Sequence, residues 1–377
     1  MVRRVMMIAG EATGDLHGGG VVRELKRRVP SVDIYGVGGD KMQQEGMELS
    51  HHIAGLSFMG LIEVVRHLAK IRRVQRALEV LLQNRRPDVV VLIDYPGFNL
   101  RFARTVKRYG IPVLYYISPQ VWAWNSGRVR KIKRLVDTMK VVFPFEVEIY
   151  KREGIDVEFV GHPVAEQIGS SISREDFFST AGLSKEKKVL AIFPGSRVQE
   201  VERILPITLE AARRLQEAHG VQVAVSVAPN LDRLIVERKI PDNGGVVLVE
   251  NATYDLMKHA DLALVASGTA TLEAGWFATP MIVVYRASPV TFWIGRMLVD
   301  IPHIGLVNIV AGKQIVPELV QHHLTAENVV RAASRVLLDA EYERKMRSEL
   351  RVIRQRLGEP GASARVAEGV VGLGRAA

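Results

Sequence analysis

The sequence predicts two α/β domains in tandem, each a doubly wound parallel sheet, followed by a helical tail. The chain has 377 residues, of which 47% are hydrophobic, and this is too long for one ordinary core. Short β-branched runs alternate with amphipathic helical stretches, the pattern of parallel sheets covered by helices on both faces. The alternation is interrupted once, between residues 161 and 188, and then restarts.

The N-terminal half shows the alternation most clearly. Its apolar runs predict strands at 4–9, 33–37, 88–93, 112–117, 138–142 and 157–160. The stretches between them predict helices near 16–29, 67–84, 100–109 and 146–153. We therefore expect a first domain that spans residues 1–165.

Pro163, Gly169 and Gly182, with three serines and a charged stretch, mark the boundary between the domains. A second domain at 186–325 repeats the plan, with predicted strands at 189–193, 221–228, 246–249, 262–265 and 281–284 and helices at 201–218 and 231–240. The tail, 326–377, has only helical patterns, at 328–338, at 341–357 and in a last short helix. It either packs back on the first domain or is exchanged in a homodimer.

Doubly wound sheets bind ligands beyond the carboxyl ends of their strands, so tandem domains predict a site in the cleft between them. Asp94 directly follows the five apolar residues of a predicted strand, which puts its charge at the mouth of that cleft. It is our first candidate for a general base, because a carboxylate near water can deprotonate an attacking hydroxyl. The alternative is a cap on the helix that begins near Asn99.

Glu11 lies in a glycine-rich turn after the first strand, where a carboxylate can accept hydrogen bonds from a sugar or act as a base. The alternative is a solvated loop residue. For the nearby Asp15 we favour a structural reading, a cap on the first helix. The glycine spacing is not Gly-x-Gly-x-x-Gly, and Glu11 would repel a pyrophosphate, so NAD is disfavoured.

Two turns of the second domain follow a strand and precede a helix. In the first, the backbone amides of Gly195 and Ser196 and the guanidinium of Arg197 face a place where a phosphate can sit. In the second, Ser267, Gly268 and Thr269 open a helix whose amides can hold a diphosphate, and Glu273, one turn along, can accept ribose hydroxyls. Two such turns in one domain predict a nucleotide site.

Composition excludes several other classes. There is no cysteine, which rules out disulfides and thiolate chemistry. No apolar stretch is long enough to span a membrane, and nothing at the N-terminus suggests export, so we expect a cytoplasmic protein. The net charge of +10 favours anionic partners, but no nucleic-acid-binding motif accompanies it. We predict no metal, since Asp-x-Asp is absent and the pairs His51-His52 and His322-His323 lack ligand spacing.

An apolar stretch, 56–65, leads into a basic one, 66–73, which suits a segment that binds acyl chains and anionic headgroups. An ordinary core helix with a basic outer face explains the pattern equally well. Trp122 and Trp124 are candidates for the lining of an acceptor site, with buried packing as the alternative.

The chain resembles the bacterial lipid-A-disaccharide synthases from Ala9 to at least Gln321. The resemblance rests on Ala9-Gly10-Glu11-Ala12-Thr13-Gly14-Asp15, Met59-Gly60-x-x-Glu63-Val64, Asp94-x-Pro96-x-Phe98-Asn99, Ser118-Pro119-x-Val121-Trp122-Ala123-Trp124, Pro144-Phe145-Glu146, Gly161-His162, Pro194-Gly195-Ser196-Arg197 and Ser267-Gly268-Thr269-Ala270. Thr13 departs from the commoner serine, and Glu166 from an aspartate that often follows the Gly-His motif.

The resemblance implies a GT-B fold, two Rossmann-like domains facing a cleft, with UDP-sugar held mainly by the second domain and acceptor by the first. It implies transfer from UDP-2,3-diacylglucosamine to 2,3-diacylglucosamine 1-phosphate (lipid X), giving the β-1,6-linked lipid A disaccharide 1-phosphate and UDP. No cofactor is implied, and the expected place is the cytoplasmic face of the inner membrane, as a peripheral protein. The family's acids match Glu11 and Asp94, its phosphate-contacting arginine matches Arg197, and its late asparagine matches Asn308.

Two other functions are compatible with the fold. A UDP-sugar 2-epimerase shares the nucleotide site but needs no lipid acceptor, and the apolar stretch 56–65 argues against it. A peripheral membrane protein that only senses nucleotide-sugar would leave Asp94 and Glu11 without a task. Turnover that depends on the acceptor distinguishes the transferase from both.

Overall fold

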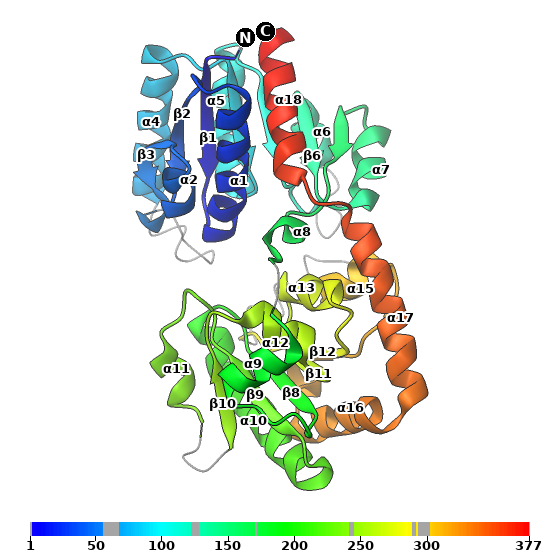
Figure 1. Cartoon of the computed structure of the whole chain (residues 1–377). Helices are drawn as coiled ribbons and strands as arrows, with labels where there is room; N and C mark the ends of the chain where they lie inside the picture. The colour runs from blue at the N-terminus through cyan, green and yellow to red at the C-terminus, as the bar shows by residue number, and fades with distance from the viewer. Residues whose placement is uncertain are drawn as a thin grey trace. The chain divides into compact units, whose positions relative to one another are not determined.

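The computed structural model describes residues 2–55, 68–121, 128–169, 172–240, 245–288, 292 and 302–376. These residues form two compact units, each built around its own sheet (Figure 1). The first unit is Met1–Glu166 together with Leu357–Ala377, and the second is Gln167–Arg356. The stretch 326–377, which the sequence analysis groups as one tail, is therefore divided between the two units.

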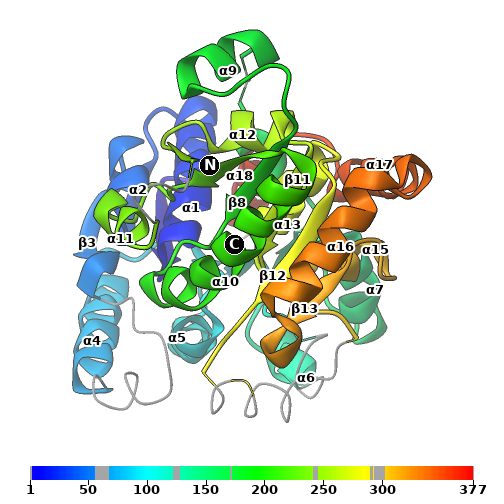
Figure 2. The ribbon, with the colours of Figure 1, turned by 90° about the horizontal axis from the view of Figure 1, so that it is seen from below.

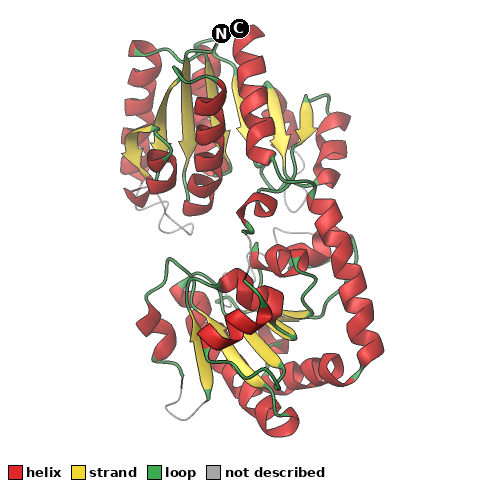
Figure 3. Ribbon diagram, in the orientation of Figure 1, coloured by secondary structure: helices red, strands yellow, loops and turns green. Residues whose placement is uncertain are grey.

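The first unit contains a seven-stranded sheet with the order β3-β2-β1-β4-β5-β6-β7, in which the neighbouring strands pair in parallel (Figure 3). Its strands are β1 (Arg4–Ala9), β2 (Asp33–Gly38), β3 (Glu48–His52), β4 (Val89–Ile93), β5 (Val113–Tyr116), β6 (Thr138–Val141) and β7 (Val157–Phe159). Its described helices are α1 (Ala12–Arg28), α2 (Asp40–Gln44), η1 (Ile53–Gly55), α4 (Leu68–Asn84), α5 (Pro96–Arg108), α6 (Arg128–Lys133), α7 (Pro144–Arg152), α8 (Val164–Gln167) and α18 (Ala362–Ala376).

Helices cover both faces of this sheet because the central strands are apolar on both sides. All five residues of β4 are buried, as a parallel strand between two helical layers requires. One face packs against α4 and α5, which contribute buried residues such as Leu78 and Phe102 to the core. The helix α18 packs against α1, β4 and β5, so the end of the chain completes the covering of the first unit.

Three consecutive glycines in α1 let neighbouring helices approach closely. A Cβ at Gly18 would lie 2.6 Å from the sulfur of Met42 in α2, and one at Gly20 would overlap Ser363 in α18. These glycines follow the first strand as the phosphate-binding glycines of a dinucleotide site would. Here their use is helix packing.

The two chain segments that form the first unit, Met1–Glu166 and Leu357–Ala377, are joined to each other by hydrogen bonds. The carboxylate of Glu166 accepts from the backbone N–H of Ser363 (2.9 Å) and from its hydroxyl (2.6 Å) at the start of α18. The backbone N–H of His162 donates to the carbonyl of Leu357 at 2.7 Å. Glu166 thus holds the returning chain in place.

The second unit repeats the plan with a six-stranded parallel sheet of order β10-β9-β8-β11-β12-β13. Its strands are β8 (Val189–Phe193), β9 (Gln222–Ser226), β10 (Val246–Val249), β11 (Leu262–Ala266), β12 (Met281–Tyr285) and β13 (Glu318–Val320). Its described helices are α9 (Arg174–Ala181), α10 (Val198–His219), α11 (Arg233–Glu237), α12 (Thr253–His259), α13 (Ala270–Trp276), α15 (Leu306–Ala311), η2 (Gln321–His323), α16 (Ala326–Leu338) and α17 (Ala340–Leu357).

In the second unit, α10 and α16 lie side by side on the sheet (Figure 2). The helix α16 contacts β11 and β12, as α18 contacts β4 and β5 in the first unit. Because α16 and α18 both come from the stretch after residue 325, this part of the chain supplies one covering helix to each sheet.

The predicted fold, two doubly wound parallel sheets, is confirmed. The strands β3 and β13, which lie at the edges of the two sheets, were not predicted from the sequence. Their sequences, Glu-Leu-Ser-His-His and Glu-Leu-Val, are polar or short, as edge strands are. The helix predicted at 231–240 is limited to α11, which begins after its N-cap Asp232.

Candidate functional site

The strand order of the first unit brings Glu11 and Asp94 together. β1 and β4 are neighbours and end level with each other, with Ala9 opposite Ile93. The chain leaves β1 toward β2 and leaves β4 toward β5, on the opposite side. Sheets of this kind bind ligands where two connections diverge in this way. Glu11 and Asp94 follow these two strands, and both are partly buried.

The backbone of Asp94 is held in an uncommon conformation by its neighbours. Asp94 and Tyr95 have φ angles of 45° and 46°. The backbone carbonyl of Asp94 accepts from the Tyr115 hydroxyl (2.6 Å) and from the Asn99 side-chain amide (2.8 Å). The backbone N–H of Asp94 donates to the backbone carbonyl of Tyr116 (2.9 Å). Left-handed backbone at a non-glycine residue is strained and is concentrated at functional sites.

Asp94 is not the N-cap residue of the next helix, which corrects this alternative from the sequence, although its carboxylate accepts a hydrogen bond from the backbone N–H of Tyr95. α5 begins at Pro96 with Tyr95 as its N-cap residue, and the Tyr95 side chain makes no capping hydrogen bond. Burial and, second, the negative charge of Glu11 raise the pKa of Asp94 to about 6. A carboxylate with this pKa is suited to take a proton near neutral pH.

Glu11 is the N-cap residue of α1 by its backbone, but its side chain makes no capping hydrogen bond. Gly10, before it, must be glycine because a Cβ there would overlap the ring of Tyr95. The turn after β1 and the turn after β4 are therefore packed directly against each other.

Asp15 has a structural role, although not the predicted one. It lies within α1 and is buried. Its carboxylate accepts from the backbone N–H groups of Gly39 (2.6 Å), Lys41 (3.0 Å) and Met42 (3.1 Å). It thus satisfies the free amides at the start of α2 rather than capping α1.

The first unit also buries two histidines that sequence analysis did not select. Burial lowers the pKa of His17 to about 4, and burial together with the nearby His17 lowers the pKa of His162 to about 3. Both rings are therefore neutral at physiological pH. The Nδ1 of His162 accepts from the backbone N–H of Val164 at 3.2 Å, which fixes its proton on Nε2. The only sequence signal was the Gly161-His162 motif.

The second unit has the same arrangement at β8 and β11. These strands are neighbours, with Phe193 opposite Val265, and their connections leave toward opposite sides of the sheet. The turn Gly195-Ser196-Arg197 follows the first strand and Ser267-Gly268-Thr269 follows the second. The two predicted phosphate-binding turns therefore lie next to each other.

The turn after β8 makes its polar contacts with two side chains that sequence analysis missed. The Ser196 N–H donates to Glu200 at 3.1 Å, and its carbonyl accepts from the Asn230 amide at 2.8 Å. The guanidinium of Arg197 donates to Glu200 at 3.0 Å. A Glu three residues after the N-cap of a helix is a recognisable signal for the first contact.

In the turn after β11, the hydroxyl of Ser267 donates to the carbonyl of Ile304 at 2.9 Å. Gly268 has a φ of 152°, which favours glycine. Thr269 is the N-cap residue of α13 but makes no side-chain cap bond.

Glu273, in the first turn of α13, is partly buried and hydrogen-bonded to Tyr254. Burial raises the pKa of Glu273 to about 7, although the Tyr254 hydrogen bond acts in the opposite direction. Its carboxylate therefore titrates close to neutral pH.

Asn308 is fully engaged inside the second unit. Its amide N–H groups donate to Val316 (2.9 Å) and Glu318 (2.7 Å), and its oxygen accepts from Ile315 (2.8 Å) and Val316 (3.1 Å). Glu318 also accepts from the backbone of Ile304 (2.9 Å) and Gly305 (3.0 Å). Glu318, held by Asn308, fixes the backbone of Ile304 and Gly305, and the Ile304 carbonyl accepts from the Ser267 hydroxyl. Asn308 therefore supports the Ser267 turn indirectly, through Glu318.

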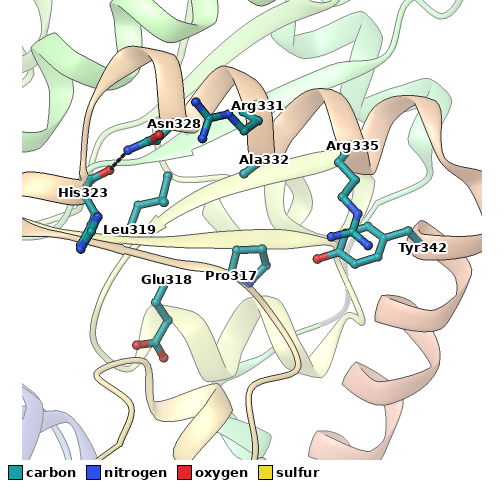
Figure 4. A pocket seen from close by; sticks show the side chains of 9 residues that line it. All are labelled: Pro317, Glu318, Leu319, His323, Asn328, Arg331, Ala332, Arg335 and Tyr342. Atoms are coloured by element: carbon teal, nitrogen blue, oxygen red, sulfur yellow. Dashed lines mark hydrogen bonds between the residues drawn. The ribbon is translucent and has the colours of Figure 1, made fainter.

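A cavity of about 520 Å³ lies beside β13 and α16 (Figure 4). Arg335 stacks on Tyr342 at 4.0 Å along one wall, and Asn328 bonds the carbonyl of His323 along another. Glu318 and His323 are the lining residues already discussed, and none of the residues predicted for catalysis or nucleotide binding lines the cavity.

The stretch 56–65 and the tryptophans Trp122 and Trp124 lie outside the described residues. Among the residues that are described, no three or more His, Asp or Glu side chains are grouped so that they could hold a metal ion. Nor does any helix within those ranges have the length and hydrophobicity to span a membrane.

The sequence matches one family of known proteins over nearly its whole length. The family model described as lipid-A-disaccharide synthetase matches residues 5–367. A lipid-A-disaccharide synthase of Geobacter metallireducens is 42% identical over 97% of this chain and 96% of its own length. One from Syntrophus aciditrophicus is 44% identical over 96% of each chain, and one from Myxococcus xanthus is 41% identical over 98% and 97%.

Solved structures resemble the fold at much lower identity. A putative UDP-N-acetylglucosamine 2-epimerase from Listeria monocytogenes superposes with a TM-score of 0.67 at 14% identity, over 97% of this chain and 95% of that one. The glycotransferase of kitacinnamycin gives 0.67 at 14% identity, over 99% of both chains. Because epimerases and transferases match equally well, these likenesses establish the fold and leave the reaction to the closer relatives.

Proposed function

The chain belongs to the lipid-A-disaccharide synthase family, and from this premise we propose that Asp94 is the general base of a single in-line sugar transfer. The reaction is that of the family, the formation of the lipid A disaccharide by a UDP-sugar-dependent glycosyltransferase. A diacylglucosamine unit passes from UDP to the 6-hydroxyl of 2,3-diacylglucosamine 1-phosphate, and UDP is released.

The observation that carries the assignment of the base is the pairing of two acids at the strand ends of the first unit. Asp94 is partly buried, its backbone is fixed by Tyr115 and Asn99, and its pKa of about 6 lies near the operating pH. Glu11 lies beside it and is the alternative base. Burial and the charge of Glu11 raise the pKa of Asp94 toward the operating pH, and this favours Asp94 for proton transfer.

In the proposed step, the acceptor oxygen attacks the anomeric carbon of the donor while its proton passes to the Asp94 carboxylate. The new C–O bond forms as the bond from the anomeric carbon to the diphosphate breaks, with inversion, and the electron pair leaves on UDP. Arg197, in the second unit, is a cation that can stabilise that charge. Ser196, Gly195, Ser267, Gly268 and Thr269 form the turns that would hold the diphosphate, and Glu273 would accept the ribose hydroxyls.

Membrane association, oligomeric state and metal independence belong to the same proposal. Both substrates carry acyl chains and negative charge, and the net charge of +10 suits the anionic surface of the inner membrane at its cytoplasmic face. We propose a peripheral protein that works without a metal ion or another cofactor, and a homodimer as its assembly.

The test is transfer by the purified full-length protein. Incubation with UDP-2,3-diacylglucosamine and 2,3-diacylglucosamine 1-phosphate in EDTA should give UDP and a disaccharide detected by mass spectrometry. UDP release without acceptor would indicate hydrolysis or epimerase chemistry instead. Loss of turnover in EDTA that Mg²⁺ restores would contradict metal independence alone.

The Asp94→Asn variant tests the base. We expect a loss of turnover of about 10²- to 10⁴-fold, the usual contribution of a general base, with UDP binding unchanged. Asp40→Asn is the matched control, because Asp40 is an exposed aspartate of the same unit. Near-normal turnover of Asp94→Asn, with a large loss in Glu11→Gln, would move the role to Glu11.

A further inference from the structure

The turn expected to receive the donor diphosphate already holds a carboxylate. Glu200 lies in the first turn of α10, and its side chain is directed back onto the turn after β8. One oxygen accepts from the Ser196 N–H at 3.1 Å and the other from the guanidinium of Arg197 at 3.0 Å. A backbone amide and an arginine are the donors that would otherwise bind a phosphate oxygen.

The contact is built into the backbone. Gly195 has a φ of 112°, and a Cβ at this position would overlap the carboxylate of Glu200. Asn230 holds the Ser196 carbonyl from the other side at 2.8 Å. The backbone N–H and carbonyl of Ser196 are thus each bonded to a side chain, Glu200 and Asn230. Any larger residue at 195 would displace Glu200.

The environments of the two charged side chains differ. The Glu200 side chain is 17% exposed and the Arg197 side chain 56% exposed. The Glu200 side chain is therefore packed within the second unit, whereas more than half of the Arg197 side chain is exposed to solvent. The ion pair uses Nη1 of a guanidinium that carries five N–H groups, so Arg197 can bind a phosphate oxygen while it stays attached to Glu200.

We infer that Glu200 is a positioning residue for donor binding: its carboxylate fixes the Gly195–Arg197 turn and aims the guanidinium of Arg197 at the diphosphate. The inference rests on the proposed function, in which Arg197 stabilises the departing UDP. The opposite role, a carboxylate that stands in for the phosphate and must be expelled by it, predicts effects of the opposite sign.

UDP binding by the full-length protein, measured by isothermal titration calorimetry, separates the two roles. If Glu200 positions Arg197, we expect Glu200→Ala to weaken UDP binding by about tenfold, the scale of a hydrogen bond to a charged group. Glu200→Gln should lose less, because its amide oxygen still accepts from Ser196 although the ion pair is gone. Tighter binding by Glu200→Ala, or no change, would overturn the inference.

A double-mutant cycle shows whether Glu200 acts through Arg197. Arg197→Ala alone should weaken UDP binding, and Glu200→Ala added to it should cost much less than in the wild-type background. Additive losses would contradict the inference. Glu202→Gln, which removes an exposed carboxylate from the same helix, is the control for net charge and should bind UDP as the wild type does.

Kinetics distinguish positioning from a general loss of structure. Glu200→Ala should raise KM for the UDP-sugar about as much as it weakens UDP binding, with KM for the acceptor unchanged and the thermal transition retained. An equal loss for both substrates would indicate damage to the fold and would refute the specific role. A wild type that turns over no substrate and binds no UDP refutes the proposed function itself, whereas a normal wild type with an indifferent Glu200→Ala refutes the positioning role alone.

Discussion

Glu11 and Asp94, although 83 positions apart in the sequence, follow neighbouring strands, and the charge of Glu11 acts on the carboxyl group of Asp94. Burial is the larger cause of the raised pKa of Asp94, about 6, and Glu11 adds to it. Two acids in different environments can take different roles in one site. The relationship has consequences for activity and for stability, and the two can be measured separately.

The pH dependence of turnover should report Asp94. A base must be deprotonated, so kcat/KM for the transfer should fall about tenfold per pH unit below about pH 6 and level off above it. Glu11→Gln removes one of the causes that raise the pKa, so the midpoint should move to lower pH. The measurement is kcat/KM between pH 4.5 and 8.5 for both proteins. An unchanged midpoint in Glu11→Gln would show that the two carboxyl groups do not interact.

Asp94→Asn should stabilise the protein at neutral and higher pH. The pKa of Asp94 is raised on folding, from 3.8 to about 6, so the folded state binds the proton more tightly than the unfolded state. Stability therefore decreases as pH rises from 3.8 to 6, and the full cost is present above pH 6. Thermal transitions of wild type and variant should differ most at pH 8 and converge near pH 4. A variant less stable than wild type at pH 8 would mean that the hydrogen bond between the Asp94 carboxylate and the Tyr95 backbone outweighs the cost of burying the charge.

The sequence predicted the sheets and the acids for the same physical reason. A parallel strand between two helical layers is apolar throughout, so β4 is recognisable, and the first polar residue after it, Asp94, must lie at the strand end. The strand order could not be predicted, because the pairing of β1 with β4 joins residues far apart in the sequence. The proximity of Glu11 to Asp94 follows from that order.

Residues that hold other residues in place are harder to recognise in the sequence than residues at strand ends. Glu318 lies in a three-residue edge strand, and only the folded chain brings its carboxylate to Asn308, Ile304 and Gly305. Asn308 could be selected through the family resemblance, but a sequence motif cannot distinguish a ligand contact from a buried support. Asp15 was interpreted as a local cap, whereas its partners lie in α2, more than twenty positions away.

Donor binding should depend on pH through Glu273. Burial raises the pKa of this group to about 7, and as a carboxylate it can accept both ribose hydroxyls. We expect UDP affinity to fall as pH decreases through 7 in the wild type. Glu273→Gln should show only the titration of the ligand's own phosphates over the same range. Identical pH profiles for the two proteins, measured by calorimetry, would exclude Glu273 from the nucleotide site.

Gly10→Ala should impair the acid pair without changing any charge. A Cβ at this position would overlap the ring of Tyr95, whose backbone at a φ of 46° is already strained, so the ring and the turn of Asp94 must move. Overpacking of this kind costs about 1–3 kcal/mol of stability, and a shifted base loses catalytic efficiency as well. Gly97→Ala is the matched control: Gly97 lies two residues from Tyr95, in the first turn of α5, and its Cβ would meet no atom within 4 Å. We expect Gly10→Ala to lower both the free energy of unfolding and kcat while UDP affinity is kept, and Gly97→Ala to leave the free energy of unfolding equal to that of wild type or up to about 1 kcal/mol higher, because alanine is the better helix former. If Gly10→Ala retained full kcat, the packing of Tyr95 on the first turn would have no part in placing Asp94, and the strain at residues 94 and 95 would have to be maintained by Tyr115, Tyr116 and Asn99 alone.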